Sequence, residues 1–342
     1  MRCDLLLSHP FFKRRYAVAT DMFVGCRIGC EFCYYRWTPF APHFRRGASL
    51  LPLCSPRDYW NVLLESKLIR PGDIILFCAR SDFSMPENRA AFSEFLEKYF
   101  DPSQKPLRFL LLQRPPWKKE DWEKFREHPV IFGTTITPCA FQKGFNSVRD
   151  DAQIRGLVEL REAGCPPERI SLELGPILPD TVEAAVEIAR VLYLNGVLTF
   201  LVYRGSSLGP GDHRKLREKG FWTELKPYTY FDGKEEKPHE YYQLKNYIPP
   251  ETEKRFLEGV EGIGLRIYRH TGHLYAKEFG ARVAVTRNNR LREDMICYAR
   301  PLSLGEVRAK LEEVFGIRCE IEEISPVLFR LHRMGTEDIA HA

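Results

Sequence analysis

Short apolar runs alternate with amphipathic stretches through the first 204 residues of the chain. Runs rich in β-branched and aromatic residues predict strands at 16–24, 73–79, 108–113, 130–137, 169–175 and 197–204. Apolar residues recur at helical spacing over 56–68, 87–100, 119–128, 148–164 and 181–196. Ser55 stands where the first of these helices needs an N-cap. The alternation predicts an α/β fold with parallel strands joined by helices.

Six strand–helix units favour a partial (β/α)6 TIM-type barrel, with an open doubly wound sheet as the alternative. The Gly- and Pro-rich stretch at 205–213 then breaks the rhythm, so we place a boundary there. The predicted domains are a barrel of residues 1–205 and a C-terminal α+β extension of residues 206–342. The extension contains a predicted helix at 251–259 and a helix–strand pair at 303–324, and its size suits a lid over a substrate pocket.

Composition adds few constraints beyond a folded, globular chain. With 44% hydrophobic and 28% charged residues, 342 residues can bury a large core. No run approaches the roughly 20 apolar residues of a membrane span, and the N-terminus does not resemble a signal peptide. We therefore expect a cytoplasmic protein without membrane contact. Its ten cysteines are unevenly spaced, which favours reduced thiols over a disulfide framework.

Positive charge is concentrated in two segments. Residues 1–50 carry eight Lys and Arg against three Asp and Glu, and residues 261–300 carry eight against four. Two such segments can meet around an anionic substrate, such as a nucleic acid or a phosphorylated molecule. Ordinary solvated surface charge explains the pattern equally well.

The most informative stretch is the sequence VGCRIGCEFC, which directly follows the first predicted strand. It places Cys26, Cys30 and Cys33 in one loop, with no fourth cysteine nearby. Thiolates at this spacing can ligate one corner of an iron–sulfur cluster and leave one iron open for a substrate or cofactor. A structural zinc site is the alternative, but zinc sites use four ligands, commonly in paired C-x2-C motifs.

This C-x3-C-x2-C loop, with aromatic Phe32 before its last cysteine, resembles the signature of radical S-adenosylmethionine enzymes. Within that superfamily, the loop and the stretch ARSDFSMPEN at 79–88 are most similar to the spore photoproduct lyase branch, although Phe83 and Ser84 replace the expected Pro and Tyr. The resemblance implies a 4Fe-4S cluster, S-adenosylmethionine, its reductive cleavage to a radical that abstracts a substrate hydrogen, and an external reductant of the flavodoxin or ferredoxin type. A non-enzymatic, zinc-stabilised nucleic-acid-binding module is the competing hypothesis.

The resemblance also implies cofactor contacts at five positions after the predicted strands. Ser81 and Asp82 would accept hydrogen bonds from the methionine amino group, or else form the turn before the next helix. Thr135 and Thr137 would bond the ribose hydroxyls or the carboxylate, or else simply fill a strand. Ile177, in a stretch similar to the superfamily's G-x-I-x-G-x-x-E pattern, would pack on adenine, or else belong to a Pro-rich turn.

Three further residues are candidates for the radical chemistry itself. Cys78 and Cys139 are hydrogen-atom donor candidates near the ends of predicted strands, although a buried cysteine is more often a packing residue. Tyr35, next to the cysteine loop, could relay an electron or shape the site. The substrate is either a nucleic acid or a nucleotide-like or other small metabolite.

Overall fold

The computed structural model describes most of the chain from residue 18 to residue 204 and separate segments beyond it. The described residues are 6–7, 18–30, 33, 43–65, 69, 71–78, 80–138, 150–204, 218, 220, 248–268, 295–297, 303–305, 308–309, 320–325 and 328–332.

A sheet of seven parallel strands forms the centre of the molecule, and neighbouring strands follow the order of the sequence. A parallel sheet in sequence order needs a crossover after each strand and places all carboxyl ends along one edge. The strands are β2 (Val18–Thr20), β5 (Ile74–Phe77), β6 (Arg108–Gln113), β7 (Val130–Ile136), β8 (Ile170–Leu174), β9 (Phe200–Tyr203) and β10 (Arg266–Tyr268).

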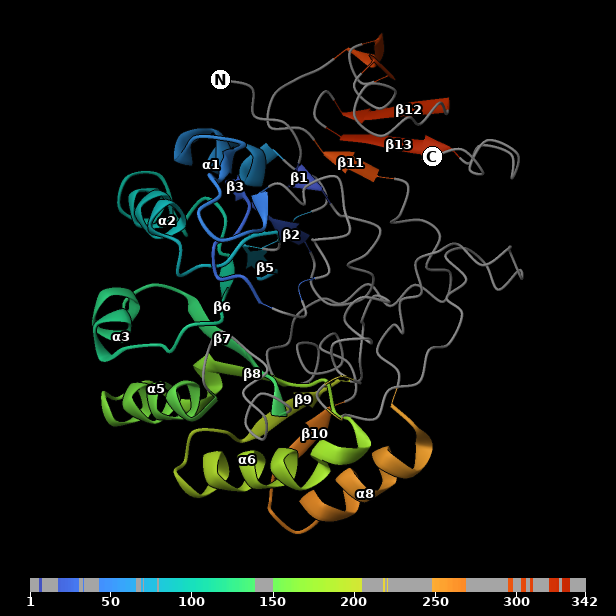
Figure 1. Ribbon diagram of the computed structural model, residues 1–342. Helices are drawn as coiled ribbons and strands as arrows, with labels where there is room; N and C mark the ends of the chain where they lie inside the picture. Colours follow the sequence, from blue (N-terminus) through green and yellow to red (C-terminus); the bar gives the residue numbers. More distant parts are fainter. Residues whose placement is uncertain are drawn as a thin grey trace.

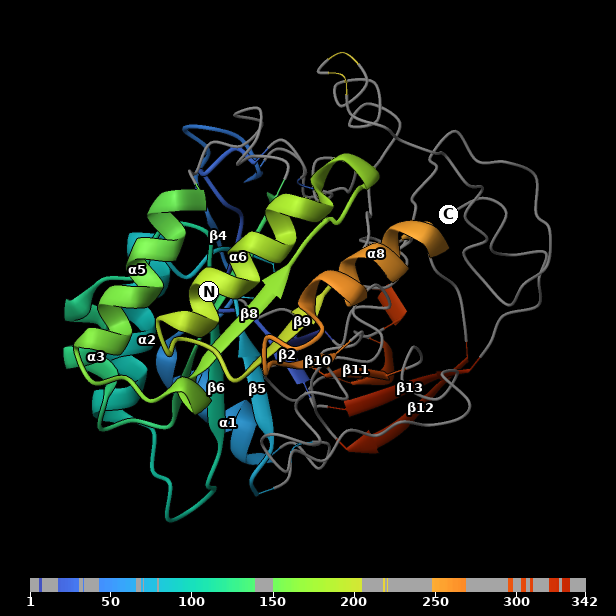
Figure 2. The ribbon, with the colours of Figure 1, turned by 90° about the horizontal axis from the view of Figure 1, so that it is seen from below.

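The helices between these strands cover one side of the curved sheet, from α1 at one end to α8 at the other (Figure 1). The view from below shows α6 and α8 side by side over β8, β9 and β10 (Figure 2). The helices are α1 (Pro56–Glu65), α2 (Pro86–Lys98), α3 (Lys119–Phe125), α5 (Asp150–Glu162), α6 (Val182–Leu194) and α8 (Pro250–Val260), with 3-10 turns η4 (Pro167–Arg169) and η5 (Pro179–Thr181).

The two faces of the sheet bury different sets of side chains because successive strand residues point to opposite sides. The main core lies between the sheet and the helices and is rich in phenylalanine. A smaller apolar cluster lies on the opposite, concave face and contains Ile74, Leu76, Leu110, Ile131, Phe200 and Val202. Full burial of each such side chain contributes roughly 1.5–3 kcal/mol. Both faces of the sheet therefore bury apolar side chains, and β8 adds the buried polar residues Ser171 and Glu173.

Two smaller sheets accompany the main one. β3 (Phe23–Val24) pairs with β4 (Leu51–Pro52), and both lie between β2 and α1 in the sequence. An antiparallel sheet joins the two ends of the chain in the order β1 (Leu6–Leu7), β11 (Met295–Cys297), β13 (Leu328–His332) and β12 (Glu320–Ser325). The strand predicted near residue 324 is confirmed as β12, while most of the helix predicted before it lies outside the described residues.

The predicted α/β class is confirmed, with two differences in detail. The described part of the predicted strand 16–24 consists of two strands, β2 and β3, which Asp21 and Met22 separate. The break occurs because Asp21 turns towards a buried arginine. β10 comes from beyond the predicted boundary at residue 205 yet pairs with β9, so the later part of the chain adds a strand to the sheet. The division into domains 1–205 and 206–342 stays a prediction.

In the described segments, β2 and β10 are the two edges of the seven-stranded sheet, which is open and compatible with a partial barrel. None of the helices in these segments is both long and apolar enough to cross a membrane.

Candidate functional site

The cysteine loop begins directly after β3 and returns to the sheet through β4. The pairing of Val24 with Leu51 brings the two ends of the loop together. The backbone of Gly25 forms a parallel bridge with Ser81, just beyond the carboxyl end of β5. The loop is therefore attached at the edge of the sheet where active sites of parallel α/β barrels lie.

A buried ion pair makes this attachment. The Asp21 carboxylate accepts hydrogen bonds from the backbone N–H of Arg80 at 2.7 Å and from its Nε at 3.0 Å. The carbonyl oxygen of Arg80 accepts from the N–H of Gly25 at 3.0 Å. Burial raises the pKa of Asp21 to about 6, although Arg80 beside it draws the value down. The pair thus connects the start of the cysteine loop to the end of β5.

Gly25 occupies a position that only glycine fits well. Its φ of +122° lies in a region that other residues rarely adopt, and a Cβ there would lie 2.8 Å from the carbonyl oxygen of His43. The same carbonyl accepts the N–H of Cys26 at 2.9 Å. Close approach of two backbone segments therefore sets the direction in which Cys26 leaves the strand.

The three cysteines of the loop are half-buried. Cys26 and Cys33 pack against the same small apolar cluster beside the loop. The N–H of Cys33 donates to the carbonyl of Cys30 at 3.3 Å, and the N–H of Ile28 donates to the sulfur of Cys26 at 3.5 Å. The loop thus places its three cysteines within one short segment and directs a backbone donor at the sulfur of Cys26.

The thiols fit a thiolate-ligated cluster in their donor chemistry. Burial raises the pKa of the Cys26 thiol well above its usual value, and negative charge on Asp82, Cys30 and Cys33 raises it further. A coordinating metal cation removes the proton from such a thiol. Among the described residues, however, no three His, Cys, Asp or Glu side chains are arranged to hold an ion.

Ser81 and Asp82 lie beside this loop, as expected, and form a hydrogen-bonded turn. One oxygen of the Asp82 carboxylate accepts from the N–H and hydroxyl of Ser84, and the other accepts from the N–H of Arg114 at 2.8 Å. Asn88 donates to the Ser81 hydroxyl at 2.9 Å, and its own Oδ1 is buried with no partner in the described part of the chain. Burial raises the pKa of Asp82 despite these hydrogen bonds.

Cys78 directly follows β5 and has an unusual backbone conformation, with a φ of +67°. A non-glycine residue in this region is uncommon and carries strain. The thiol is buried, and burial raises its pKa well above the usual value, while a hydrogen bond from Ser81 lowers it in part. Negative charge on Cys26 is among the causes that raise it. Cys78 is therefore a buried neighbour of the cysteine loop, and its catalytic role stays a prediction.

Thr135 is the next-to-last residue of β7, and Thr137 follows that strand. Both are joined to Arg114, the residue after β6, which the sequence did not indicate. Nη1 of Arg114 donates to the carbonyl of Thr135 at 2.6 Å and to the hydroxyl of Thr137 at 2.9 Å. Thr135 is half-buried, whereas Thr137 is fully buried. The two threonines and Arg114 lie at the same edge of the sheet as the Ser81–Asp82 turn, which Arg114 also contacts.

Ile177 is fully buried in the main core, so its side chain presents no exposed surface to an adenine ring. Its adenine contact stays a prediction. Phe32, Tyr35 and Cys139 lie outside the described residues.

A second ion pair lies further along the carboxyl edge and was also missed. Glu173 on β8 is buried and pairs with Arg204, the residue after β9. The available signal was a charged residue inside an apolar strand, since Glu173 interrupts the run ISLEL and Asp21 interrupts YAVATDMFV. Such residues are almost never buried without a partner.

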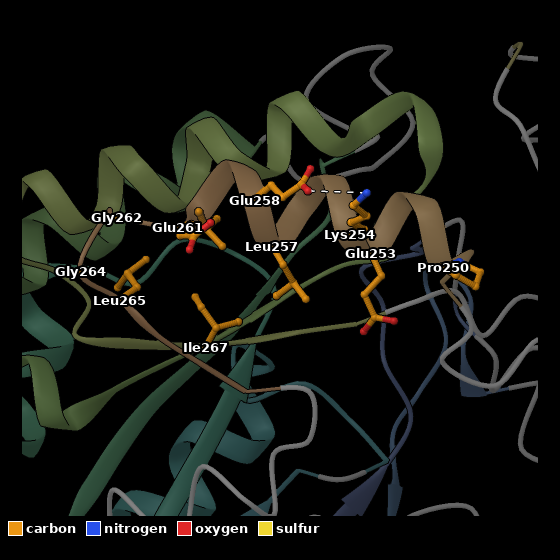
Figure 3. A pocket seen from close by; sticks show the side chains of 11 residues that line it. Pro250, Glu253, Lys254, Leu257, Glu258, Glu261, Gly262, Gly264, Leu265 and Ile267 are labelled. Carbon is orange, nitrogen blue, oxygen red and sulfur yellow. Dashed lines mark ion pairs between the residues drawn. The ribbon is translucent and has the colours of Figure 1, made fainter.

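A separate hollow of about 950 Å³ lies away from all these residues, between α8 and the segment leading into β10 (Figure 3). Leu257, Leu265 and Ile267 form its apolar floor. Glu258 and Lys254 form an ion pair on its rim at 3.9 Å. None of the residues proposed from the sequence lines it.

Comparison with known proteins does not assign the chain to a family. Neither family models nor curated proteins match the sequence. Among solved structures, a mutant of spore photoproduct lyase is similar at a TM-score of 0.49 and 13% sequence identity, over 72% of this chain and 74% of that one. Similarity at this level does not establish a shared family. Any inference about the class of protein must therefore come from the site residues.

Proposed function

We propose that this chain is a radical S-adenosylmethionine enzyme on a partial (β/α)6 TIM-type barrel. The observation that supports this most is the position of the loop that carries Cys26, Cys30 and Cys33, which is attached through the bridge of Gly25 and Ser81 just beyond the carboxyl end of β5. A three-cysteine loop with this spacing leaves one ligand position of a 4Fe-4S cluster for a second cofactor.

In this proposal the three cysteines hold the cluster. When bound, the cluster and S-adenosylmethionine supply reductive cleavage of a sulfonium C–S bond, with the electron coming from an external reductant of the flavodoxin or ferredoxin type. The chain supplies binding, orientation and exclusion of water. Gly25 and the Asp21–Arg80 pair keep the loop against β5, so the ligands stay next to the Ser81–Asp82 turn.

The polar groups beside the loop suit the parts of S-adenosylmethionine that need hydrogen bonds. The Ser81 hydroxyl, the Asp82 carboxylate and the unpartnered Oδ1 of Asn88 are acceptors for a cationic amino group. Thr135 and Thr137 offer hydroxyls to the ribose or to the carboxylate. We also propose Phe32 as a cofactor contact, and Cys78, Cys139 and Tyr35 as candidates for hydrogen or electron transfer.

The test is anaerobic reconstitution of the full chain with iron and sulfide, followed by dithionite and S-adenosylmethionine. We expect iron–sulfur absorbance, bound iron and sulfide, and formation of 5′-deoxyadenosine. Replacement Cys30→Ala removes one proposed ligand and is expected to abolish 5′-deoxyadenosine formation and most of the bound iron.

Replacement Cys165→Ala is the matched control, because Cys165 is also a free thiol but is buried before β8, at the opposite edge of the sheet. It should retain iron and cofactor cleavage. Tight zinc binding without iron–sulfur absorbance in the unchanged protein would contradict the proposal and favour a zinc-stabilised binding module.

A further inference from the structure

Glu173 and Arg204 lie on the concave face of the sheet, opposite the helices. Residues 170, 172 and 174 of β8 all belong to the core between sheet and helices, so the alternation of the strand directs Glu173 to the other face. On β9, Val202 belongs to the concave apolar cluster, and Arg204 follows it by two positions. Glu173 is in register with Thr135 on one side and Val202 on the other. The pair therefore lies above the apolar cluster, at the carboxyl edge.

The backbone of Arg204 is held on both sides. Its N–H donates to the carbonyl of Leu174 at 2.8 Å, and its carbonyl accepts from the N–H of Ile177 at 2.9 Å. A Cβ at Gly175 would lie 2.6 Å from that carbonyl, so the turn after β8 packs directly on Arg204. The side chain therefore starts from a rigid position, as a pre-organised binding residue requires.

The guanidinium of Arg204 has donor capacity that no residue of the described segments uses. One Nη group donates to Glu173, whose side chain is only 4% exposed, while that of Arg204 is 22% exposed. Nε of Arg204 is buried and has no hydrogen-bond partner in the described segments. Buried donors without a partner are rare in folded proteins and call for an explanation. Arg114, by contrast, is already bonded to β7.

We propose that Arg204, oriented by Glu173, binds an anionic group of the substrate, either a carboxylate or a phosphate. The planar fork of a guanidinium matches both groups with two parallel hydrogen bonds. The proposal rests on the proposed function only in naming the ligand as the substrate of that enzyme. It narrows the substrate to molecules that carry an anion and places that anion on β8 and β9, away from the cysteine loop on β3.

The experiment is a calorimetric titration of the full chain with inorganic phosphate and, separately, with succinate, at constant ionic strength adjusted with chloride. The unchanged protein is expected to bind at least one of the two, and the tighter of them tells which anion the site prefers. Replacement Arg204→Gln should weaken that binding about ten- to a hundredfold, the range for a lost charge-assisted pair. Replacement Arg204→Lys keeps the charge without the fork and should restore only part of the affinity.

Two further variants control for misfolding and for non-specific loss of charge. The double replacement Glu173→Gln with Arg204→Gln avoids an unpaired buried carboxylate if the single variant does not fold, and it should also lose binding. Replacement Arg255→Gln removes an exposed guanidinium that pairs with Glu183 on the helix side and should bind as the unchanged protein does.

Absence of binding by the unchanged protein, or equal binding by the folded Arg204 variants, overturns the proposal. The titration needs neither iron nor S-adenosylmethionine, so its failure is distinguishable from failure of the proposed function. Anion binding through Arg204 in a chain that takes up no cluster overturns the proposed function alone.

Discussion

At the residue scale, charged residues inside apolar strands are the clearest sequence signal of the buried ion pairs near this site. Asp21 and Glu173 are each buried and each paired with an arginine, 59 and 31 positions away in the sequence. Their positions in apolar runs predict that they need partners. The identity of those partners could not be predicted, because Arg80 and Arg204 reach them only through strand pairing.

The pH dependence of stability should reveal the burial of Asp21. Its pKa rises from 3.8 to about 6 on folding, so the folded state binds the proton more tightly and the contribution of Asp21 to stability falls as pH rises from about 4 to 6. Replacement Asp21→Asn removes this titration. At 1.36 kcal/mol per pKa unit, the free energy of unfolding of the unchanged protein, relative to that of the variant, should fall by about 3 kcal/mol across this range.

Urea unfolding of both proteins at several pH values between 4 and 6.5 measures this difference. The variant lacks the charged partner of Arg80, and this loss shifts its free energy of unfolding by the same amount at every pH. The change of the difference with pH therefore still reports the titration of Asp21. A difference that does not change with pH would mean that Asp21 titrates in the folded state as it does in the unfolded chain.

At the scale of elements, the hydrophobic periodicity predicted strands and helices well where turn-forming residues lie at both of their ends. β6 covers residues 108–113 as predicted, and α1 is capped by Ser55, whose hydroxyl accepts the N–H of Asp58 at 3.2 Å. The division of the first strand was not predicted. It depends on the contact of Asp21 with Arg80, which the hydrophobic pattern of residues 16–24 does not contain.

Phe83 explains why the segment before α2 departs from the motif that it resembles. Its ring is fully buried and packs against Phe77, Phe92 and Phe125, with the guanidinium of Arg89 5.3 Å from its centre. The segment that carries Ser81 and Asp82 is thereby anchored in the core between sheet and helices. A proline at this position would not provide that anchor.

Replacement Phe83→Ala should lower the free energy of unfolding by about 3–5 kcal/mol, the usual cost of a cavity of this size. Chemical denaturation followed by circular dichroism measures it. Replacement Leu194→Ala is the control, since Leu194 is 73% exposed and should change stability by less than about 0.5 kcal/mol. A change of similarly small size for Phe83→Ala would show that this ring does not anchor the segment.

At the scale of the whole molecule, the fold brings together two basic segments that lie far apart in the sequence. β1 belongs to residues 1–50 and β11 to residues 261–300, and the two strands pair. These strands bring the two basic segments into contact, while their meeting around an anionic substrate stays a prediction. The seventh strand, β10, lies in the second segment and forms the far edge of the main sheet.

This arrangement makes salt dependence the test between a polymeric and a small anionic substrate. If the substrate is a nucleic acid, affinity for single-stranded or duplex oligonucleotides should fall about a thousandfold or more between about 50 and 200 mM salt, as for proteins that contact several phosphates. Fluorescence anisotropy at a series of salt concentrations measures it. Absence of binding at the lowest salt would exclude the polymer and leave a small anionic metabolite.

The sequence by itself determined the order of strands and helices and the spacing of the three cysteines. Both depend on neighbours within a few positions, and hydrophobic periodicity and turn residues encode them locally. Only the tertiary structure decided that Asp21 pairs with Arg80, that Glu173 orients Arg204, and that β10 extends the sheet. Those contacts join residues far apart in the chain, and they form only when parallel strands align and bury charges that must then be paired.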